Sequence, residues 1–310
     1  MAEKRALVLG CGGVAGGAWS IAMLEEVEKH LDWPMQSADI FIGTSVGAVL
    51  ATLLAQGVSV NALVRCQAGQ GLQRLWNHDK DTGGALPPLP TLRLQHLNLL
   101  RLGLKGEVNA LTAAMGLLPT GRAGMSGFTR LIDSVVPAGN WSDHPCTWLM
   151  AVDVATGKRV ALGRDIINMP MNKAVCASYA VPGWCPPVRW QGKTYLDGGI
   201  ASPISADFLL GQGVAEAVVI APMASSRLDS PRHPFSKIER SVRRYMASIV
   251  EREVAALRAE GVKVLLLEPG PTDLATFGFN LMNPRSRKQV LRTAFSTRGK
   301  TMADAMRLFY

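Results

Sequence analysis

The 310-residue sequence has few cysteines, few charged residues and no long apolar run. Its five cysteines form no Cys-x-x-Cys pair and no cluster with histidine, so neither a disulfide framework nor a structural metal site is expected. The uncharged stretch from Ala6 to Leu24 contains five glycines, which argues against the helical core of a signal peptide. No apolar run is long enough to span a bilayer. We therefore expect reduced thiols in a cytoplasmic protein.

Only 18% of the residues are charged, but positive charge dominates, and the formal net charge is +9. The basic residues form two groups, Arg232, Lys237, Arg240, Arg243 and Arg244, and then Arg285, Arg287, Lys288, Arg292, Arg298, Lys300 and Arg307. Such groups attract anionic membranes, so peripheral membrane contact is expected, although a solvated helical face is the simpler interpretation of each group. No nucleic-acid-binding module accompanies them, so nucleic acid is not expected as a partner.

Strand-like and helix-like segments alternate along the chain, which predicts an α/β fold with a mainly parallel central sheet covered by helices on both faces. The expected strands are Ala6–Leu9, Asp39–Ile42, Thr147–Val154, Thr194–Leu196, Ala217–Ala221 and Val262–Leu267. The expected helices are Gly17–His30, Val46–Gln56, Val60–Trp76, Asn109–Met115, Gly127–Val135, Lys173–Ser178, Pro203–Leu210, Lys237–Glu260 and Ser286–Leu308. Thr156-Gly157 predicts a hairpin and hence one antiparallel edge.

A serine stands in the segment Gly43-Thr44-Ser45-Val46-Gly47, between an expected strand and an expected helix. Glycines two residues before and after a serine allow a tight turn that leaves the hydroxyl free to attack a carbonyl carbon. The following helix directs its N-terminal amides toward the reacting oxygen. A structural turn is the simpler interpretation, but the strand-turn-helix context makes Ser45 a candidate nucleophile.

Two other segments provide the remaining parts of a hydrolytic site. The first expected strand runs into Gly10-Cys11-Gly12-Gly13-Val14-Ala15-Gly16-Gly17, which presents backbone amides at the start of a helix. Tyr195-Leu196-Asp197-Gly198-Gly199 places a carboxylate at the end of a short strand, where glycines allow another group to approach closely. Asp197 could take the proton from Ser45.

These three motifs, in this order and spacing, resemble the patatin-like phospholipase family of lipid acyl hydrolases, which use a Ser-Asp dyad. The stretch from Ala177 to Pro182 and the approach to Asp197 from Gly192 also look like that family. The resemblance covers most of the chain and implies a three-layer patatin-like fold. It implies one domain over residues 1–310, with a cap or insertion around 80–125 and a basic helical C-terminal extension around 284–310.

The resemblance also implies a role for each matching residue. Ser45 is the expected nucleophile, Asp197 the general base, and the Gly12 and Gly13 amides the oxyanion hole. The expected supporting glycines are Gly16, Gly43, Gly47, Gly198 and Gly199. No cofactor or metal is expected, and calcium independence follows from the family. The implied substrate is a lipid or another acyl ester.

Three positions depart from the family pattern. Cys11 stands where the family usually has glycine, and its side chain could tilt the loop. Ala15 replaces a basic residue, which would lower activity if that charge supports the loop or a lipid phosphate. Ser202 precedes Pro203 where many relatives have asparagine, so a supporting hydrogen bond is expected to be missing.

Three alternatives remain open. A Ser-Asp-His triad of the α/β-hydrolase type would need a histidine after Asp197, and only His233 meets that requirement. A dinucleotide-binding unit would use the same glycine-rich turn, with Asp32 as the ribose-binding acid, but Asp32 does not end a strand. A catalytically impaired lipid-binding module would keep the fold without turnover.

Residues 80–106 differ from the rest of the chain. Gly83 to Pro90 cannot form a regular helix, and the Leu-rich stretch that follows carries Arg93, Arg101 and Lys105. A helix packed on the core is one interpretation. A cap that borders the acyl-binding pocket and docks on lipid is the other.

Overall fold

The structure is a computed structural model that describes residues 3–70, 86, 88–91, 94 and 96–309. Its centre is an eight-stranded mixed sheet with the strand order β5-β6-β3-β2-β1-β7-β8, in which β4 also pairs with β3. The strands are β1 (Lys4–Leu9), β2 (Ile40–Thr44), β3 (Thr147–Asp153), β4 (Arg159–Leu162), β5 (Val188–Trp190), β6 (Lys193–Asp197), β7 (Val214–Ile220) and β8 (Lys263–Leu267). The pairs among β3, β2, β1, β7 and β8 are parallel, whereas β4, β5 and β6 form the antiparallel part.

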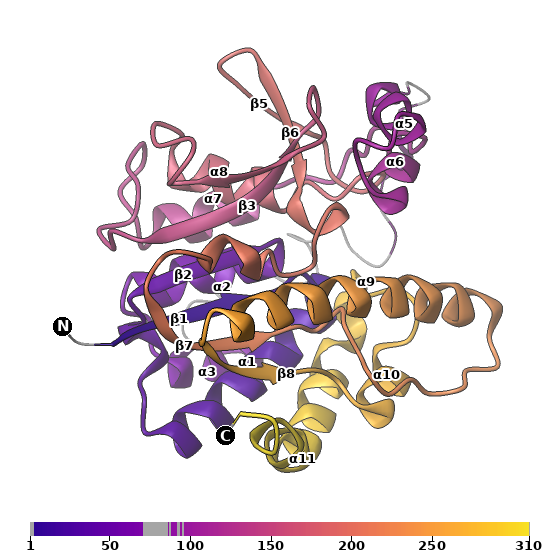
Figure 1. Cartoon of the computed structure of the whole chain (residues 1–310). Helices are drawn as coiled ribbons and strands as arrows, with labels where there is room; N and C mark the ends of the chain where they lie inside the picture. The colour runs from indigo at the N-terminus through magenta and orange to yellow at the C-terminus, as the bar shows by residue number, and fades with distance from the viewer. Residues whose placement is uncertain (1–2, 71–85, 87, 92–93, 95, 310) are drawn as a thin grey trace.

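Helices cover both faces of the sheet. They are α1 (Gly13–Leu31), α2 (Val46–Ala55), α3 (Val60–Ala68), α5 (Leu97–Leu104), α6 (Ala110–Met115), α7 (Ser126–Asp133), α8 (Met171–Ser178), α9 (Pro234–Ala259), α10 (Pro271–Phe277) and α11 (Arg287–Met306). In Figure 1, α9 crosses in front of β7 and β8, while α1 and α3 lie behind the sheet.

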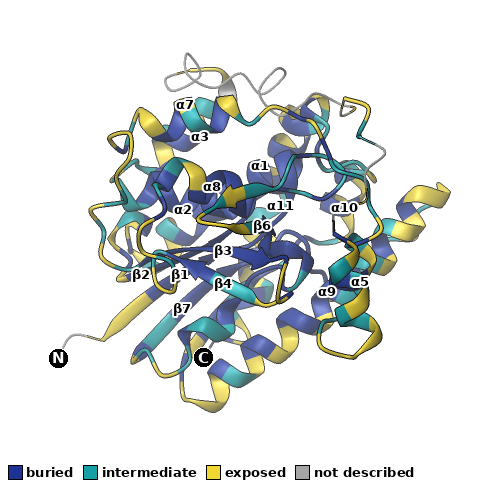
Figure 2. Cartoon of the chain, turned by 90° about the horizontal axis from the view of Figure 1, so that it is seen from above, coloured by how far each residue is buried: buried dark blue, intermediate teal, exposed yellow. Residues whose placement is uncertain are grey.

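Strand β1 shows why the sheet lies in the middle of three layers. Leu7 and Leu9 point into the apolar core that contains α1, α2 and α11, whereas Ala6 and Val8 point into the second core, which is formed with α9. All four side chains are buried because successive residues of a strand face opposite sides. The expected α/β fold with both faces covered is therefore confirmed, and Figure 2 shows the buried strands enclosed by partly exposed helices.

The six expected strands all form, with ends shifted by a few residues. The hairpin at Thr156-Gly157 is confirmed, because β4 pairs antiparallel with β3 from Val152 opposite Arg159. The antiparallel part is larger than a single edge, since β5 and β6 add a second hairpin next to β3. The three-residue strand β5 is too short to produce a recognisable alternation in the sequence.

The expected helix Pro203–Leu210 is wrong: only a 3₁₀ turn forms, at Ala206–Leu209. Ser205 precedes it with a left-handed backbone (φ 54°), which a continuous α-helix does not allow. Helix α10 was not predicted, and α3 ends at Ala68, while residues 71–76 of its expected range lie outside the described part.

The Leu-rich stretch contains a real helix, α5, which packs against α6. Leu99 is fully buried against Val152 and Leu196, whereas Leu104 at the end of α5 is 83% exposed. Part of the expected cap, residues 80–85, 87, 92–93 and 95, lies outside the described residues. The division into one domain, a cap and a C-terminal extension therefore stays a prediction.

The two basic groups are less exposed than the sequence indicated. Arg240, Arg243 and Arg287 are at most 5% exposed, because each donates hydrogen bonds to groups inside the protein. Arg298 pairs with Glu26 of α1 at 2.9 Å, so it joins α11 to α1. Within the described residues, no helix combines the length and apolar composition that crossing a membrane requires.

Candidate active site

Two strands meet end to end along one edge of β3. β2 runs parallel to β3 and ends with Thr44 opposite Met150, whereas β6 runs antiparallel and ends with Asp197 opposite Ala151. β4 pairs with both Met150 and Ala151 from the other side, so β2 and β6 share the remaining edge. Their carboxyl ends therefore face each other, and Ser45, which follows Thr44, lies next to Asp197 in one cavity.

Ser45 occupies the tight turn between β2 and α2. Its backbone has φ 58° and ψ −122°, a combination that residues with a side chain rarely adopt. A Cβ atom at Gly43 would lie 2.6 Å from the Cα of Ala48, and one at Gly47 would lie 2.0 Å from the carbonyl oxygen of Leu9. Both glycines are thus required by close backbone contacts, and the turn has the geometry expected from its sequence.

A hydroxyl from helix α8 holds this turn. Ser178 is fully buried, and its Oγ accepts a hydrogen bond from the Ser45 N–H at 2.9 Å and donates one to the carbonyl oxygen of Met150 at 2.7 Å. Ser178 lies in the family-like stretch from Ala177 to Pro182, but the sequence indicated no role for it. Nothing in the local sequence indicates its role, because its two partners, Ser45 and Met150, are far away in the chain.

Asp197 is 4% exposed, accepts a hydrogen bond from the Gly199 N–H at 2.7 Å, and lines the same cavity as Ser45. Burial raises the pKa of Asp197 to about 7, and the neighbouring Ser45 hydroxyl and the Gly199 N–H offset part of that rise. A carboxylate with this pKa is a stronger base than an exposed one. It is ionised, and able to accept a proton, above neutral pH.

The glycine loop lies at the N-terminus of α1, where Gly12 is the N-cap and Gly13 has φ 58°. The Cys11 N–H donates to Pro203 and the Ala15 N–H to Leu281, which fixes the loop on both sides. No group among the described residues accepts a hydrogen bond from the Gly12 or Gly13 N–H. Both glycines line the cavity that contains Ser45, at the positive end of the α1 dipole.

The structure shows how the three departures are accommodated. The Cys11 side chain is buried against Gly199, where an added Cβ would lie 2.8 Å from the Cys11 sulfur. Ala15 is fully buried in the first turn of α1 and brings no charge. Ser202 Oγ accepts the Ser205 N–H at 2.9 Å, so this hydroxyl supports the turn after Asp197.

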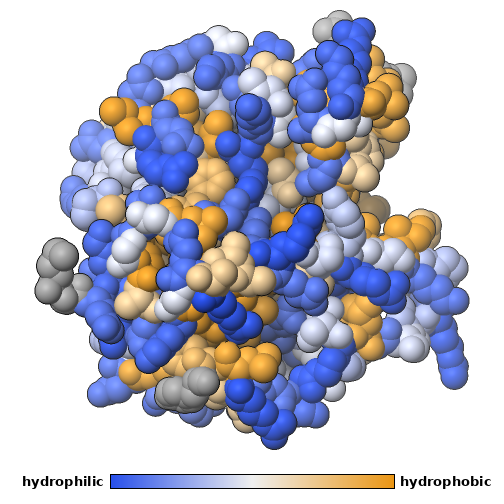
Figure 3. Space-filling view, viewed as in Figure 1, coloured by the Kyte–Doolittle hydropathy of each residue, from blue (hydrophilic) through white to orange (hydrophobic). Residues whose placement is uncertain are grey.

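The cavity around Ser45 has a volume of about 290 Å³ and is almost entirely apolar. Its walls come from α6, α9 and the segment after α10, and they are formed by Leu111, Met115, Val242, Met246, Leu281 and Met282. In Figure 3, the outline of the molecule is notched between the α5–α6 helices and the projecting end of α9. An apolar chain attached to a carbonyl group at Ser45 would find no charged wall here apart from Asp197.

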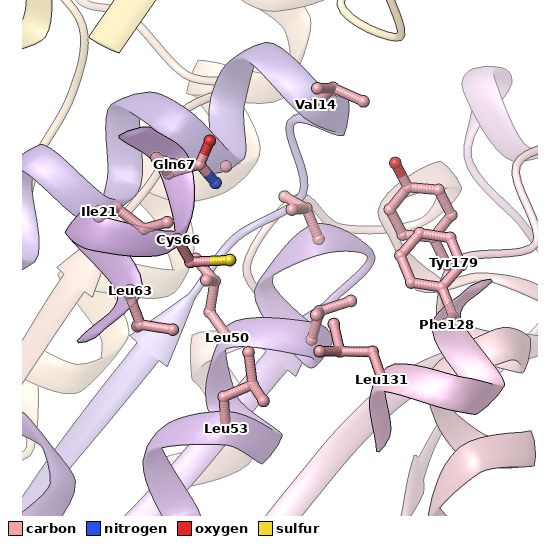
Figure 4. Close-up of a pocket in the computed structure, with 13 residues that line it drawn as sticks. Val14, Ile21, Leu50, Leu53, Leu63, Cys66, Gln67, Phe128, Leu131 and Tyr179 are labelled. Carbon is pink, nitrogen blue, oxygen red and sulfur yellow. The ribbon is translucent and has the colours of Figure 1, made fainter. Parts of the chain in front are cut away.

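A smaller cavity of about 60 Å³ lies between α1, α2, α3 and α7 (Figure 4). Val46 follows Ser45 and Val14 follows Gly13, so two of its wall residues are sequence neighbours of the site. The rings of Tyr179 and Phe128 pack against each other in one wall, with their centroids 4.3 Å apart. This cavity is also mainly apolar.

The structure does not bring His233 to Ser45. His233 is exposed at the start of α9, stacks on Phe279 at 5.3 Å, and is not among the residues that line the cavity. Asp32 follows α1 as its C-cap rather than ending a strand, so it does not match a ribose-binding acid. Within the described ranges, no three His, Cys, Asp or Glu side chains form a group suited to a metal ion.

Comparisons with known proteins add a family assignment. The family model described as patatin-like phospholipase matches residues 7–210. No curated protein matches the sequence. Among solved structures, the chain is similar to VipD from Legionella pneumophila, with 14% identity and a TM-score of 0.44, covering 98% of this chain and 67% of that chain.

Two further structures are similar. The type III effector protein ExoU has 14% identity and a TM-score of 0.37, covering 98% of this chain and 53% of that chain. Human GIVD cytosolic phospholipase A2, solved in complex with methyl gamma-linolenyl fluorophosphonate, has 12% identity and a TM-score of 0.40, covering 98% of this chain and 59% of that chain. The chain thus spans between about half and two thirds of the length of these proteins.

Proposed function

The chain belongs to the patatin-like phospholipase family, and from this premise we propose that it is a serine lipid acyl hydrolase that cleaves acyl esters of phospholipids and related lipids through an acyl-enzyme. The observation that carries the proposal is that Ser45, the buried Asp197 carboxylate, Gly12 and Gly13 line one apolar cavity.

In the proposed reaction, Ser45 Oγ attacks the ester carbonyl carbon while Asp197 accepts the hydroxyl proton. The tetrahedral intermediate places its negative oxygen at the Gly12 and Gly13 amides, and each such donor contributes roughly a hundred- to a thousand-fold in other acyl-transfer enzymes. The leaving alcohol takes the proton from Asp197. A water molecule then transfers a proton to the same carboxylate and attacks the acyl-enzyme. Asp197 returns that proton to Ser45 Oγ as the bond to the acyl group breaks, which releases the fatty acid and restores Ser45.

The apolar walls support a long hydrocarbon chain as the part of the substrate that enters the cavity. A headgroup with a charge would remain outside, because desolvating an unpaired charge against these walls is costly. The exposed cations and the exposed apolar side chains Leu104, Phe235 and Ile238 support peripheral contact with an anionic membrane.

The experiment that tests the activity is labelling with a fluorophosphonate probe together with hydrolysis of p-nitrophenyl esters. Ser45→Ala and Asp197→Asn should each abolish turnover, and Ser45→Ala should also abolish labelling. Ser205→Ala and Asp153→Asn are the matched controls, because Ser205 is buried with positive φ and Asp153 is a buried carboxylate, both outside the cavity.

The alternatives predict other results. A lipid-binding module without turnover would bind lipid while Ser45 stays unlabelled and no ester is hydrolysed. A Ser-Asp-His triad would lose its activity in His233→Ala, a change that a Ser-Asp dyad tolerates. Undiminished turnover in either Ser45→Ala or Asp197→Asn would contradict the proposal itself.

A further inference from the structure

The side chain of Arg243 is a fully buried cation directly behind the glycine loop. It is 0% exposed and lies on the inner face of α9, in a part of the chain that the family model does not cover. Removing a guanidinium from water is expensive unless its donors are satisfied. Its Nε and Nη2 donate to Glu239 at 3.0 and 2.7 Å, and its Nη1 donates to the carbonyl oxygen of Pro222.

The contact with Pro222 connects Arg243 to the glycine loop. An added Cβ at Gly12 would lie 2.8 Å from the Pro222 ring, and one at Gly16 would lie 3.1 Å from it, so the ring packs directly on both glycines. Arg243 Nη2 also lies 3.9 Å from the sulfur of Met223, which forms part of the cavity wall. One guanidinium therefore holds the segment on which the loop rests.

The charge of Arg243 also acts on the loop. It lowers the pKa of the Cys11 thiol, against the larger rise caused by burial, so its positive potential extends to the residue next to Gly12. Ala15 has no charge in the first turn of α1, and no acidic side chain lies there. A fixed cation behind two backbone amides increases their ability to stabilise a negative oxygen in a water-excluded site.

We propose that Arg243 is a positioning residue for the oxyanion hole, which holds Pro222 against Gly12 and Gly16 and places a fixed positive charge behind the Gly12 and Gly13 amides. This rests on the proposed hydrolase function. Arg243 does not touch the reacting atoms. It acts through the backbone of residues 222–223 and through its electric field.

Arg240 is a matched control on the same helix. It is 4% exposed and shares Glu239 as a partner, but its other hydrogen bonds are to Asp229, Leu274 and Gly278, away from the glycine loop. Losing either arginine breaks a buried ion pair of the same network, so both losses should lower stability. Of the two arginines, Arg243 is the one that donates a hydrogen bond to Pro222.

The test compares Arg243→Met, Arg243→Lys and Arg240→Met in the full chain, with kcat and KM measured on a soluble p-nitrophenyl ester and Tm measured in parallel. Arg243→Met should lower kcat by about tenfold or more with KM changed by less than about threefold, because the loss affects the transition state. Arg243→Lys keeps the charge and should recover most of kcat. Arg240→Met should lower Tm to a similar extent while kcat stays within about threefold.

Equal kcat losses in Arg243→Met and Arg240→Met, or an unchanged kcat in Arg243→Met, would overturn the proposal. If Arg243→Met does not fold, the double variant Glu239→Gln with Arg243→Met removes the unpaired acid and is measured instead. Amide hydrogen exchange of residues 10–16 gives a readout independent of hydrolysis. It should be faster in the Arg243 variant than in Arg240→Met, and equal exchange would contradict the positioning role even if the proposed activity itself fails.

Discussion

Ser178 joins the backbone of Ser45 to strand β3. Its hydroxyl accepts the Ser45 N–H and donates to the Met150 carbonyl, so α8, β3 and the turn after β2 are connected through one buried oxygen atom. The positive φ of Ser45 is an unfavourable conformation that persists only where the surroundings hold it. Ser178 is the side chain that provides this support at the turn.

Replacing Ser178 with alanine should therefore weaken both the fold and the reaction. The Ser45 N–H and the Met150 carbonyl would lose their buried partner, which costs about 1–3 kcal/mol of unfolding free energy. A less strictly held nucleophile should also lower kcat by roughly tenfold. Urea denaturation and ester hydrolysis measure the two effects, with Ser205→Ala as the buried-serine control. Full activity in Ser178→Ala would show that the turn holds itself.

The pKa of Asp197 predicts the pH dependence of the rate. Because the carboxylate must be ionised to accept the Ser45 proton, and burial raises its pKa to about 7, kcat/KM should rise with pH up to about 7 and then level off. Initial rates on a soluble ester between pH 5 and 9 measure this, with folding checked at each pH. A rate that is constant from pH 5 to pH 8 is the contradictory result.

The same pKa predicts that Asp197→Asn stabilises the protein at alkaline pH. In the unfolded chain the group has its ordinary pKa near 3.8, so between about pH 4 and pH 7 the folded state holds a proton that the unfolded state has lost. Stability therefore falls as pH rises through this window, and the loss is complete above about pH 7. Asparagine avoids it, and a gain of at least about 1 kcal/mol would raise Tm by about 1.5 °C in a chain of this size.

Thermal unfolding of wild type and Asp197→Asn at pH 5 and pH 8 measures this gain. Burial also raises the pKa of Glu253, so wild-type stability alone does not isolate Asp197. The difference between the two proteins does, and it should grow with pH. A variant that is less stable than wild type at pH 8 would exclude a buried, ionised carboxylate at this position.

Gly47 should tolerate no side chain. A Cβ there would lie 2.0 Å from the Leu9 carbonyl oxygen, which is backbone at the end of β1 and cannot easily move, so Gly47→Ala should cost more than about 3 kcal/mol or prevent folding. Gly124→Ala is the control, because an added Cβ meets nothing within 4 Å and should change stability by less than about 0.5 kcal/mol. Similar Tm values for the two variants would mean that β1 and α2 are not in close contact.

Local chemistry explains what the sequence predicted well. The Ser45 turn, the glycine loop and the turn at Asp197 each depend on glycines whose need is set by neighbours close in sequence or by adjacent strands. Hydrophobic periodicity likewise located the six main strands. The meeting of Ser45 and Asp197 was inferred from a family resemblance, and its structural cause, the end-to-end arrangement of β2 and β6 on β3, is not visible in either motif.

Long-range pairing explains what the sequence missed. Arg240 and Arg243 have the spacing of an exposed basic face, but buried partners draw them inward. Pro203–Leu210 has helical composition, yet Ser205 adopts a left-handed backbone and Asp207 pairs with Arg159 at 2.6 Å. Each outcome depends on a residue at least one element away, which periodicity does not report.

The remaining exposed cations predict salt-sensitive binding to anionic vesicles. Lys288 and Arg292 are exposed one turn apart on α11, and each cation near an anionic surface contributes about 1 kcal/mol. The double variant Lys288→Ser with Arg292→Ser should therefore weaken binding by roughly thirtyfold, measured by co-sedimentation in a Ser45→Ala background so that no lipid is hydrolysed.

Lys158→Ser with Arg189→Ser is the control, because these exposed cations lie outside both basic groups. Higher salt should reduce wild-type binding. Equal binding to neutral and anionic vesicles, or equal losses in both double variants, would rule out this surface.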